Sequence, residues 1–340
     1  MNKSGTTQNK QIQEQTLHLP EPPIVTPHPP RILDQFRALL VAMRPRQWTK
    51  NVIVFIGVVF AQRIFNILAF ERAMFAFVVF CLASSCVYLL NDLHDLENDR
   101  MHPTKRFRPL ASGALLKEWA KIAIGVLLIA DFAIVALIFL LPLPGPNDLF
   151  ARLGGANILF VLALAAYLVL MVLYTSRLKH VVLIDVFIIA SGFVLRILAG
   201  AVVIPVAISP WLYCVACFLS LFLALSKRRH ELLLLQEQAS THRQILKEYS
   251  IPMLDQMITI VAAGTVMSYS LYTFQGPAGH DGMSITIPFV LYGIFRYLYL
   301  MYMRMQGGSP EEVLLSDRHM LATVMLCTIC ILLVLYALPQ

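Results

Sequence analysis

The sequence predicts an all-α, polytopic membrane protein built as a bundle of nine membrane-crossing helices. Of the 340 residues, 58% are hydrophobic and 14% are charged, and the mean hydropathy of +0.70 lies far above that of a soluble domain. The charged residues are concentrated between apolar runs of about 18 to 25 residues, the length of a helix that crosses a hydrocarbon core. No alternation of apolar and polar residues is sustained along the chain, which argues against a membrane β-barrel.

The chain divides into a polar tail, residues 1–33, and a membrane domain, residues 34–340. The tail is rich in proline and has no apolar periodicity, so we expect it to be disordered and cytoplasmic. It has no apolar core of the kind found in a signal peptide. Residues 34–51 predict a helix at the membrane interface, with Arg44 and Lys50 close to Trp48, an aromatic side chain suited to the headgroup zone.

Nine apolar segments follow, and each predicts one membrane crossing. Their approximate ranges are 48–65, 73–92, 119–141, 155–175, 182–204, 209–226, 253–274, 284–303 and 318–338. With the tail in the cytoplasm, the opposite side would keep only Arg63, Arg72 and Arg152 of the many basic residues. The positive-inside rule therefore predicts a plasma (inner) membrane protein with a cytoplasmic amino terminus and an outside carboxyl terminus.

The most informative stretch, residues 88–113, begins where the second apolar segment ends. On a helix with about 100° per residue, Asp92, Asp95 and Asp99 fall within a sector of about 60°, and Asn91 lies one turn from Asp95. Carboxylates this close repel one another unless a counter-charge is present. Mg²⁺ prefers carboxylate oxygens and leaves room for substrate phosphates. The alternative is a solvated loop of mixed charge at the end of a membrane helix.

A basic segment follows the carboxylates directly and contains Lys105, Arg106 and Arg108. Cations close to a Mg²⁺ site are what a departing diphosphate requires. The acids and bases are sorted into two blocks, which favours a binding site on the cytoplasmic side over a mixed-charge loop.

A second polar group lies between the fourth and fifth segments and contains Tyr174, Lys179 and Asp185. We expect Lys179 and Asp185 at the same membrane face as the first group, although Asp185 could serve only the dipole of its own helix. Arg196 lies about three turns deeper and needs an internal partner or an aqueous cavity. An ion pair with Asp131 and a role in lining the substrate site both stay open.

A third polar group lies between the sixth and seventh segments and runs from Ser226 to Tyr249. It includes Lys227, Arg228 and Glu231, and its length suits a cytoplasmic lid over a site. A plain connector drawn to anionic lipid headgroups is the alternative. The two CxxC pairs of the chain lie inside apolar runs without nearby metal ligands, so we interpret them as helix-packing residues.

Two segments of the chain resemble motifs of the UbiA superfamily of intramembrane prenyltransferases. NDLHDLEND (91–99) resembles its first aspartate-rich motif, NDxxDxxxD, and YTSRLKHVVLID (174–185) resembles its second region. The match is closer to the branch of decaprenyl-phosphate phosphoribosyltransferases, which synthesise decaprenyl-phosphate 5-phosphoribose. RPRQWTKN (44–51), HPTKRFRP (102–109), GFVLR (192–196) and KRRHE (227–231) carry that closer resemblance.

The resemblance implies a nine-helix fold and Mg²⁺-dependent transfer of 5-phosphoribose from 5-phosphoribosyl 1-diphosphate to a polyprenyl monophosphate. It implies that four carboxylates serve catalysis and bind the metal: Asp92, Asp95, Asp99 and Asp185. The substrate-binding residues that it implies are Lys50, Asn91, Lys105, Arg106, Arg108, Tyr174, Lys179, Arg196, Lys227, Arg228 and Glu231. The apolar groove between the helices would take the isoprenoid tail.

One departure from the family pattern bears on the substrate. Aromatic prenyltransferases of the superfamily usually carry DxxxD in the second region, whereas Asp185 is followed four residues later by Ile189. The loss of a carboxylate suits an acceptor that is itself a phosphate monoester.

Two other functions stay open at this point. One is transfer of an isoprenyl chain to an aromatic ring, and the other is secondary transport with Arg196 and Asp131 on the substrate or proton path. We expect no nucleic-acid partner, because the basic residues lie in short loops beside membrane segments. Whether the chain forms a homo-oligomer also stays open.

Overall fold

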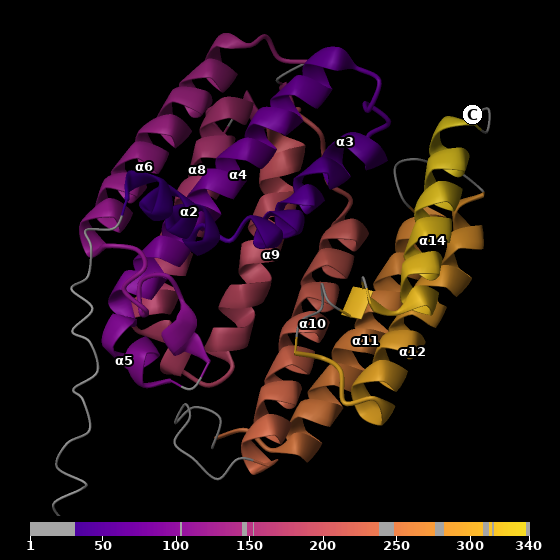
Figure 1. Ribbon diagram of the computed structural model, residues 1–340. Helices are drawn as coiled ribbons and strands as arrows, with labels where there is room; N and C mark the ends of the chain where they lie inside the picture. Colours follow the sequence, from indigo (N-terminus) through magenta and orange to yellow (C-terminus); the bar gives the residue numbers. More distant parts are fainter. Residues whose placement is uncertain are drawn as a thin grey trace, which may run out of the picture.

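Long apolar helices that run alternately in opposite directions make up the molecule (Figure 1). The computed structural model describes residues 31–337 apart from 103, 145–147, 152, 238–247, 276–281, 309–312 and 315. Nearly all of the expected disordered tail, and Arg152, lie outside the described residues. We call "site end" the end of the bundle where α4, α8, α10 and α12 end and α6, α9, α11 and α14 begin; it is the lower end in Figure 1. The opposite end is the far end.

Every regular element in the described part of the chain is helical. The long helices are α4 (Ile67–His94), α6 (Lys117–Leu140), α8 (Ala156–Ser176), α9 (Ile184–Val202), α10 (Pro210–Glu237), α11 (Ile251–Gln275), α12 (Ile287–Met303) and α14 (Arg318–Tyr336). The short ones are α2 (Ile32–Ala42), α3 (Ile56–Phe60), α5 (Leu96–Met101) and α7 (Asp148–Ala151), with 3₁₀ helices η2 (Pro45–Phe55), η3 (Lys105–Phe107), η4 (Leu178–His180) and η6 (Met283–Thr286). The prediction of an all-α fold is confirmed.

Eight helices of the described part are long and apolar enough to cross a membrane, so the chain is a multi-pass membrane protein. They match eight of the nine predicted segments to within a few residues, except that α4 and α10 are longer than predicted. The remaining segment, 48–65, is not one α-helix: η2 is followed directly by α3. A 3₁₀ helix rises about 2.0 Å per residue and an α-helix about 1.5 Å, so the pair is about 30 Å long, roughly the thickness of a hydrocarbon core. The expected ninth crossing therefore corresponds to a stretched, composite segment.

The predicted interfacial helix over residues 34–51 ends early. The helix α2 stops at Ala42, and Arg44 adopts a left-handed backbone conformation with φ of 55°. Arg44 precedes Pro45, and the proline ring disfavours the α-helical conformation in the residue before it. The chain therefore turns at Arg44 before η2 enters the bundle.

Two glycines let the composite segment pack directly against α9. A Cβ atom on Gly200 would lie only 1.9 Å from the carbonyl oxygen of Val54, and one on Gly57 would lie 2.9 Å from the Cα of Ala201. Close backbone approach through small residues is typical of helix contacts in membranes. The position of η2, including Lys50 and Asn51, is therefore fixed relative to α9.

Arg72 joins three helices near the far end and is fully buried. Its Nε donates to the carbonyl of Val203 at 2.6 Å, and its Nη1 donates to those of Ile138 at 2.9 Å and Leu141 at 3.0 Å. Its Nη2 donates to Asn157, at the start of α8. The carbonyls belong to the last turns of α6 and α9, which have no partners within their own helices. Arg72 therefore satisfies two helix ends at once, far from the predicted site.

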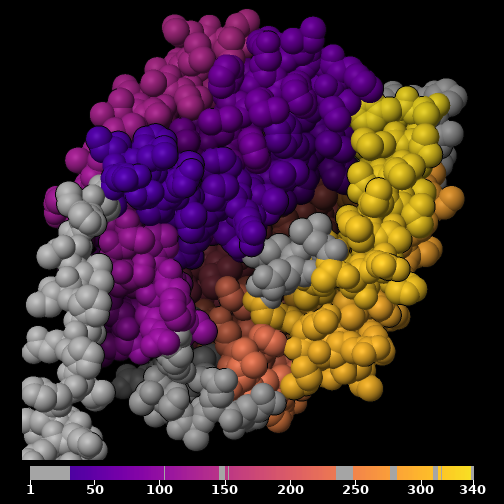
Figure 2. Space-filling view, viewed as in Figure 1, coloured from indigo at the N-terminus to yellow at the C-terminus, as the bar shows by residue number. Residues whose placement is uncertain are grey.

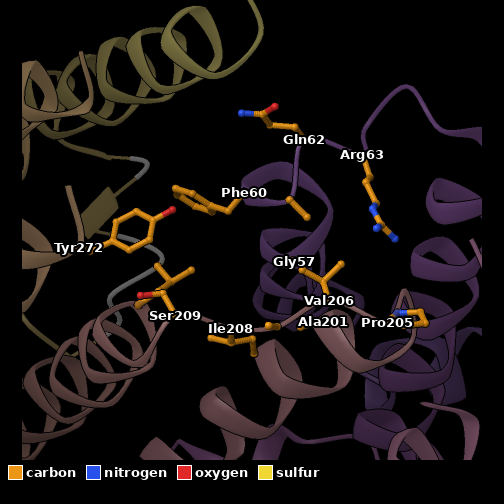
Figure 3. Close-up of a pocket in the computed structure, with 13 residues that line it drawn as sticks. Gly57, Phe60, Gln62, Arg63, Ala201, Pro205, Val206, Ile208, Ser209 and Tyr272 are labelled. Atoms are coloured by element: carbon orange, nitrogen blue, oxygen red, sulfur yellow. The ribbon is translucent and has the colours of Figure 1, made fainter. Parts of the chain in front are cut away.

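A cavity of about 450 Å³ lies near the far end, between α3, the end of α9 and α11 (Figure 3). Gly57, Phe60, Ile208 and Tyr272 are among the residues that line it, and the Tyr272 hydroxyl points toward Phe60. An apolar cluster that includes Ile53 of η2, Val194 of α9 and Ala216 of α10 lies nearer the site end.

Candidate active site

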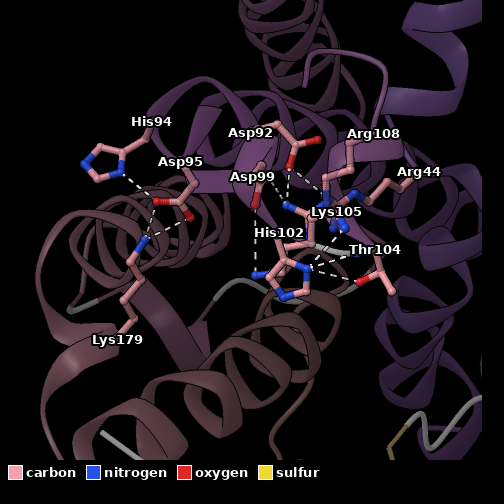
Figure 4. Close-up of polar contacts among 10 residues, drawn as sticks. All are labelled: Arg44, Asp92, His94, Asp95, Asp99, His102, Thr104, Lys105, Arg108 and Lys179. Carbon is pink, nitrogen blue, oxygen red and sulfur yellow. Dashed lines mark hydrogen bonds and ion pairs between the residues drawn. The ribbon is translucent and has the colours of Figure 1, made fainter. Parts of the chain in front are cut away.

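The first aspartate-rich motif spans a break between two helices. The helix α4 ends at His94, Asp95 forms the junction and α5 begins at Leu96, so the single continuous helix expected here is interrupted at Asp95. Asp92 and Asp99 remain on one side, and both are almost fully buried. The break lets Asp95 take a different partner from the other two carboxylates (Figure 4).

Asp92 and Asp99 share one guanidinium group. Arg108 Nη1 lies 3.2 Å from Asp92 Oδ1 and 2.6 Å from Asp99 Oδ2. Arg44 Nη2 also donates to Asp92 Oδ1, at 2.7 Å, and Lys105 Nζ lies 4.0 Å from Asp99 Oδ1. The expected repulsion between carboxylates is therefore offset by side chains of the basic segment and by Arg44.

Asp95 links the first polar group to the second. Lys179 Nζ donates to both carboxylate oxygens of Asp95, at 2.6 and 2.9 Å, and His94 Nδ1 lies 3.1 Å from Oδ1. Burial alone would raise the pKa of Asp95, but the hydrogen bonds and charges of Lys179 and His94 outweigh it and hold that pKa below its ordinary value. Asp95 is therefore an ionised partner of Lys179, as the expected proximity of the two groups requires.

Asp185 links the second polar group to the third. It is fully buried at the start of α9, and its Oδ2 forms an ion pair with Arg228 Nε at 2.6 Å. The Tyr249 hydroxyl donates to Oδ1 at 2.7 Å. Arg228 also pairs with Glu231 through Nη1 and donates to the Tyr174 hydroxyl through Nη2 at 3.3 Å. Asp185 therefore does more than interact with the dipole of its own helix.

A groove of about 530 Å³ opens beside these ion pairs, between η2, α9, α10, α12 and α14. Figure 2 shows the surface hollowed between the indigo N-terminal helices and yellow α14. Most of the lining is apolar, and Lys50 and Lys227 are the only charged side chains among the described residues that line it. Ile189, one turn beyond Asp185, and Phe193 form part of the apolar wall. The groove therefore combines an apolar interior with two ammonium groups next to the Asp185–Arg228 pair.

The structure joins neither Arg106 nor Asn91 to the ion pairs described above, and their roles in binding substrate stay predictions. Arg106 is exposed, with its guanidinium over the ring of Phe107, and the side chain of Asn91 makes no hydrogen bond among the described residues. The first part of the third polar group does not form a separate lid, because α10 continues through it without a break to Glu237. Residues 238–247 lie outside the described residues.

The alternative of an Asp131–Arg196 ion pair is wrong. Arg196 donates to Asn51 Oδ1 at 2.6 Å, to the carbonyl of Gly192 at 2.7 Å and to the Tyr167 hydroxyl at 2.9 Å. Both carboxylate oxygens of Asp131 are buried without a hydrogen-bond partner among the described residues. The helix α6 of Asp131 packs on α4, whereas Arg196 turns toward η2 and α8, so similar depth in the membrane did not bring the two together.

Sequence reasoning missed two site residues, Arg44 and Tyr249. Arg44 was interpreted as an interfacial cation, but its left-handed turn directs it to Asp92. The position of Arg44 immediately before Pro45 is the one signal that could have indicated a turn there. Nothing in the local sequence distinguishes Tyr249 from the other aromatic residues near membrane interfaces.

The residues present fit a magnesium ion at one point of the site. No group of three or more His, Cys, Asp or Glu side chains in the described ranges lies close enough together to hold a metal. Asp92 and Asp99 nevertheless converge on a single positive charge, Arg108 Nη1. Mg²⁺ in phosphoryl enzymes is commonly bound by one or two carboxylates together with substrate phosphates. Asp185, engaged by Arg228 and Tyr249, makes no direct contact with the other three carboxylates.

Solved structures with the same fold support this arrangement of helices. A UbiA homologue from Archaeoglobus fulgidus, described as bound to GPP and Mg²⁺, matches with a TM-score of 0.62 and 17% identity over 86% of this chain and 96% of that one. A digeranylgeranylglyceryl phosphate synthase matches with a TM-score of 0.58 and 18% identity over 90% and 100% of the two chains. At these identities the likeness concerns the fold alone.

Relatives at higher identity cover most of the chain. A decaprenyl-phosphate phosphoribosyltransferase from Corynebacterium glutamicum is 34% identical over 89% of this chain and 88% of its own length. A protein of that name from Mycolicibacterium smegmatis is 34% identical over 88% and 92%, and one from Mycobacterium tuberculosis is 33% identical over 85% and 91%. The model of the UbiA prenyltransferase family matches residues 51–310. Together with the fold and the first aspartate-rich motif, this match means that the chain belongs to the UbiA prenyltransferase family.

Proposed function

We propose that this membrane protein transfers 5-phosphoribose from 5-phosphoribosyl 1-diphosphate to a polyprenyl monophosphate of the decaprenyl type and releases diphosphate. The names of relatives about one-third identical over most of the chain support this proposal. The site supports it as well, because its cations suit phosphorylated reactants and its groove suits a long apolar tail.

The observation that carries the choice of acceptor is the place of Ile189. In aromatic prenyltransferases of the superfamily this position usually holds the second aspartate of DxxxD. Here Ile189 lies in the wall of the apolar groove, one turn from the Asp185–Arg228 pair and on the same groove as Lys227. A second carboxylate there would repel a phosphate monoester, whereas an apolar wall admits the tail behind that phosphate.

We propose that the site end faces the cytoplasm of a cell whose plasma membrane the chain spans. The described residues at that end include Lys105, Arg108, Lys117 and Lys179, while Arg63 and Arg72 lie toward the far end. This asymmetry follows the positive-inside rule. It would place the site where a soluble, phosphorylated sugar donor is available.

Mg²⁺ would be held by Asp92 and Asp99, with Asp95 beside them. Asp185 would contribute to binding of the metal indirectly, through contacts with the bound substrate. When bound, the ion would stabilise negative charge on the departing diphosphate. Two nearly buried carboxylates that share one guanidinium nitrogen support this choice of ligands.

The chemistry asks the protein mainly to bind and orient its reactants. An oxygen of the lipid phosphate forms the new bond to the anomeric carbon of the ribose, and the bond from that carbon to the diphosphate oxygen breaks. The attacking phosphate is already anionic, so no general base is required, and both substrates can be held by cations. Lys50 and Lys227 lie where the headgroup of a lipid in the groove would rest, and Arg108, Lys105 and Lys179 lie near the motif carboxylates.

A labelled-donor assay tests the proposal. Purified protein in detergent receives polyprenyl phosphate and phosphoribosyl diphosphate labelled in the ribose, and, in parallel, labelled prenyl diphosphate with an aromatic acceptor. We expect label from the ribose in the lipid product and none from the prenyl donor. Label transferred only from the prenyl diphosphate would instead assign the chain to aromatic prenylation. Flux of substrate into sealed vesicles with no lipid product would indicate a transporter.

A pair of glycine variants tests the groove. Gly293 lies in the groove wall, and a Cβ there would meet only a methyl group at 3.9 Å, so Gly293→Leu should fill the cavity and raise the KM for the lipid acceptor roughly tenfold or more. Gly125 on α6 has open space around it, so Gly125→Leu is the matched control. Equal KM values for the lipid in the two variants would argue against the groove as the acceptor site.

A further inference from the structure

Leu183, two residues before Asp185, has a backbone conformation that side chains rarely adopt. Its φ of 68° and ψ of −43° lie in a region that is unfavourable for a residue with a Cβ. Such a conformation persists only when surrounding contacts hold it, and it is concentrated at functional sites. The carbonyl of Leu183 accepts from the N–H groups of Val186 and Phe187, and its own N–H donates to the Tyr249 hydroxyl at 2.7 Å.

The same hydroxyl also holds Asp185. Tyr249 accepts the N–H of Leu183 and donates its own proton to Asp185 Oδ1 at 2.7 Å. Tyr249 is only 5% exposed and Asp185 is fully buried, so water does not replace either bond. A carboxylate oxygen can only accept, so the proton in the Tyr249–Asp185 hydrogen bond is the one on the tyrosine hydroxyl.

With one oxygen of Asp185 held by Tyr249, the other forms an ion pair with Arg228 that lacks the alignment of a hydrogen bond. Asp185 Oδ2 lies 2.6 Å from Arg228 Nε, and the two Nη atoms of Arg228 reach Glu231 and the Tyr174 hydroxyl. An arginine can hold a phosphate in a defined direction only when its fork is itself fixed. We propose that Tyr249 is a positioning residue: it holds the Leu183 turn and the Asp185 carboxylate so that Arg228 is oriented toward the phosphates of the sugar donor. The proposal rests on the function proposed above.

Removal of the hydroxyl tests this role. Tyr249→Phe leaves the Leu183 N–H and one Asp185 oxygen buried without partners, so we expect kcat/KM for phosphoribosyl diphosphate to fall roughly 10- to 100-fold. The fall should come mainly from KM for the donor, with KM for the lipid changed less than about twofold, because the groove is untouched. Tyr269→Phe is the matched control: Tyr269 is also a buried tyrosine with one side-chain hydrogen bond, to Thr286 Oγ1 at 2.6 Å, but α11 carries it far from the site.

A double-mutant cycle separates positioning from a merely structural role. If Tyr249 acts through Asp185, the combination of Tyr249→Phe with Asp185→Asn should be no less active than Asp185→Asn alone. Losses that multiply, or a Tyr249→Phe enzyme that behaves like Tyr269→Phe, would overturn the proposal. Leu183→Gly relieves the backbone conformation and provides a background in which Tyr249→Phe can fold. In that background the donor KM should stay raised, and its full recovery would mean that the tyrosine serves only the turn.

Binding of inorganic diphosphate in the presence of Mg²⁺, measured by calorimetry, gives a readout that needs no turnover. We expect roughly tenfold weaker binding in Tyr249→Phe than in Tyr269→Phe. A wild-type protein that forms no lipid product but shows this difference would disprove the proposed reaction and leave the positioning role intact. Equal diphosphate affinities would disprove the positioning role, whichever reaction the wild type catalyses.

Discussion

Five buried or half-buried cations of this molecule fall into two sets that differ in what they contact. At the site end, Arg108, Lys179 and Arg228 each face a carboxylate. Deeper in the bundle, Arg72 and Arg196 face neutral groups, namely carbonyl, amide and hydroxyl oxygens and, for Arg196, aromatic rings. Both sets are largely shielded from water, so the difference lies in the charge of the partner.

The difference indicates which cations are free to change partners. A cation paired with a carboxylate can exchange that partner for a phosphate, while the carboxylate takes up a metal ion, with little change in total charge. Arg72 is held by four neutral acceptors. Without Arg72 only water could donate hydrogen bonds to these acceptors, and the bundle excludes water. We therefore expect substitutions at the site end to affect turnover, and substitutions in the deeper set to affect folding.

Asp92→Asn should produce the largest effect on turnover. The change removes a charge that Arg44 and Arg108 share and that the proposed Mg²⁺ requires, so activity should fall roughly 1000-fold while the melting temperature in detergent changes little. Glu97→Gln on the adjacent short helix is the control, because Glu97 is exposed and pairs only with surface bases. An Asp92→Asn protein with near wild-type activity would contradict the metal assignment.

Arg72→Met should show the opposite pattern. Loss of three hydrogen bonds at two helix ends and a fourth to Asn157 should destabilise the fold by about 3 kcal/mol or more, seen as a lower melting temperature or lower yield of monodisperse protein. Activity per folded molecule should stay close to wild type. Arg63→Met removes two bonds to carbonyls at a half-buried position and should cost less. A stable Arg72→Met protein with impaired catalysis would remove the distinction between the two sets.

Lys179→Met should have an intermediate effect. It leaves Asp95 without its cation, next to the other motif carboxylates, so kcat/KM should fall roughly 10- to 100-fold. Lys121→Met is the control, because Lys121 forms a comparable pair with Glu118 on an exposed surface, where such pairs contribute little. Equal activities in the two variants would mean that the Asp95–Lys179 contact has no part in catalysis.

The smallest expected effect is on the stability of the protein and the protonation of Asp95 at acid pH. The pKa of Asp95 is depressed in the fold, so its contact with Lys179 stabilises the protein above the unfolded pKa of about 4 and is lost as pH falls through the lower, folded value. In Lys179→Met the main cause of the depression is absent, and Asp95 should protonate at a higher pH. Infrared difference spectra of the carboxyl band, with Asp95→Asn to identify the signal, would measure the shift. An unchanged protonation midpoint would contradict the role given to Lys179.

The sequence predicted features that depend on residues near one another in the chain. The apolar segments predicted nine helices, eight of which are single long helices in the described part, and the seven-residue spacing of Asp92 and Asp99 predicted their shared side. The sequence did not predict the 3₁₀ helix η2. This helix packs closely on α9 through the contact of Val54 with Gly200, and these residues lie far apart in the sequence. The Asp131–Arg196 pair, one of two alternatives that the sequence left open, is wrong for a related reason: hydropathy gives the depth of a residue but not the neighbour that its helix faces. The orientation in the membrane and the metal ligands stay predictions.

The groove between α9, α10, α12 and α14 has a consequence for the surroundings of the protein. Under the proposed function, its apolar wall and its two lysines would bind a flexible tail joined to an anion. Fatty acids and other single-chain anionic amphiphiles should therefore compete for it, whereas neutral sugar-headed surfactants should compete less. The free fatty acid content of a membrane or micelle would then determine the fraction of protein molecules whose groove is free to bind the lipid acceptor.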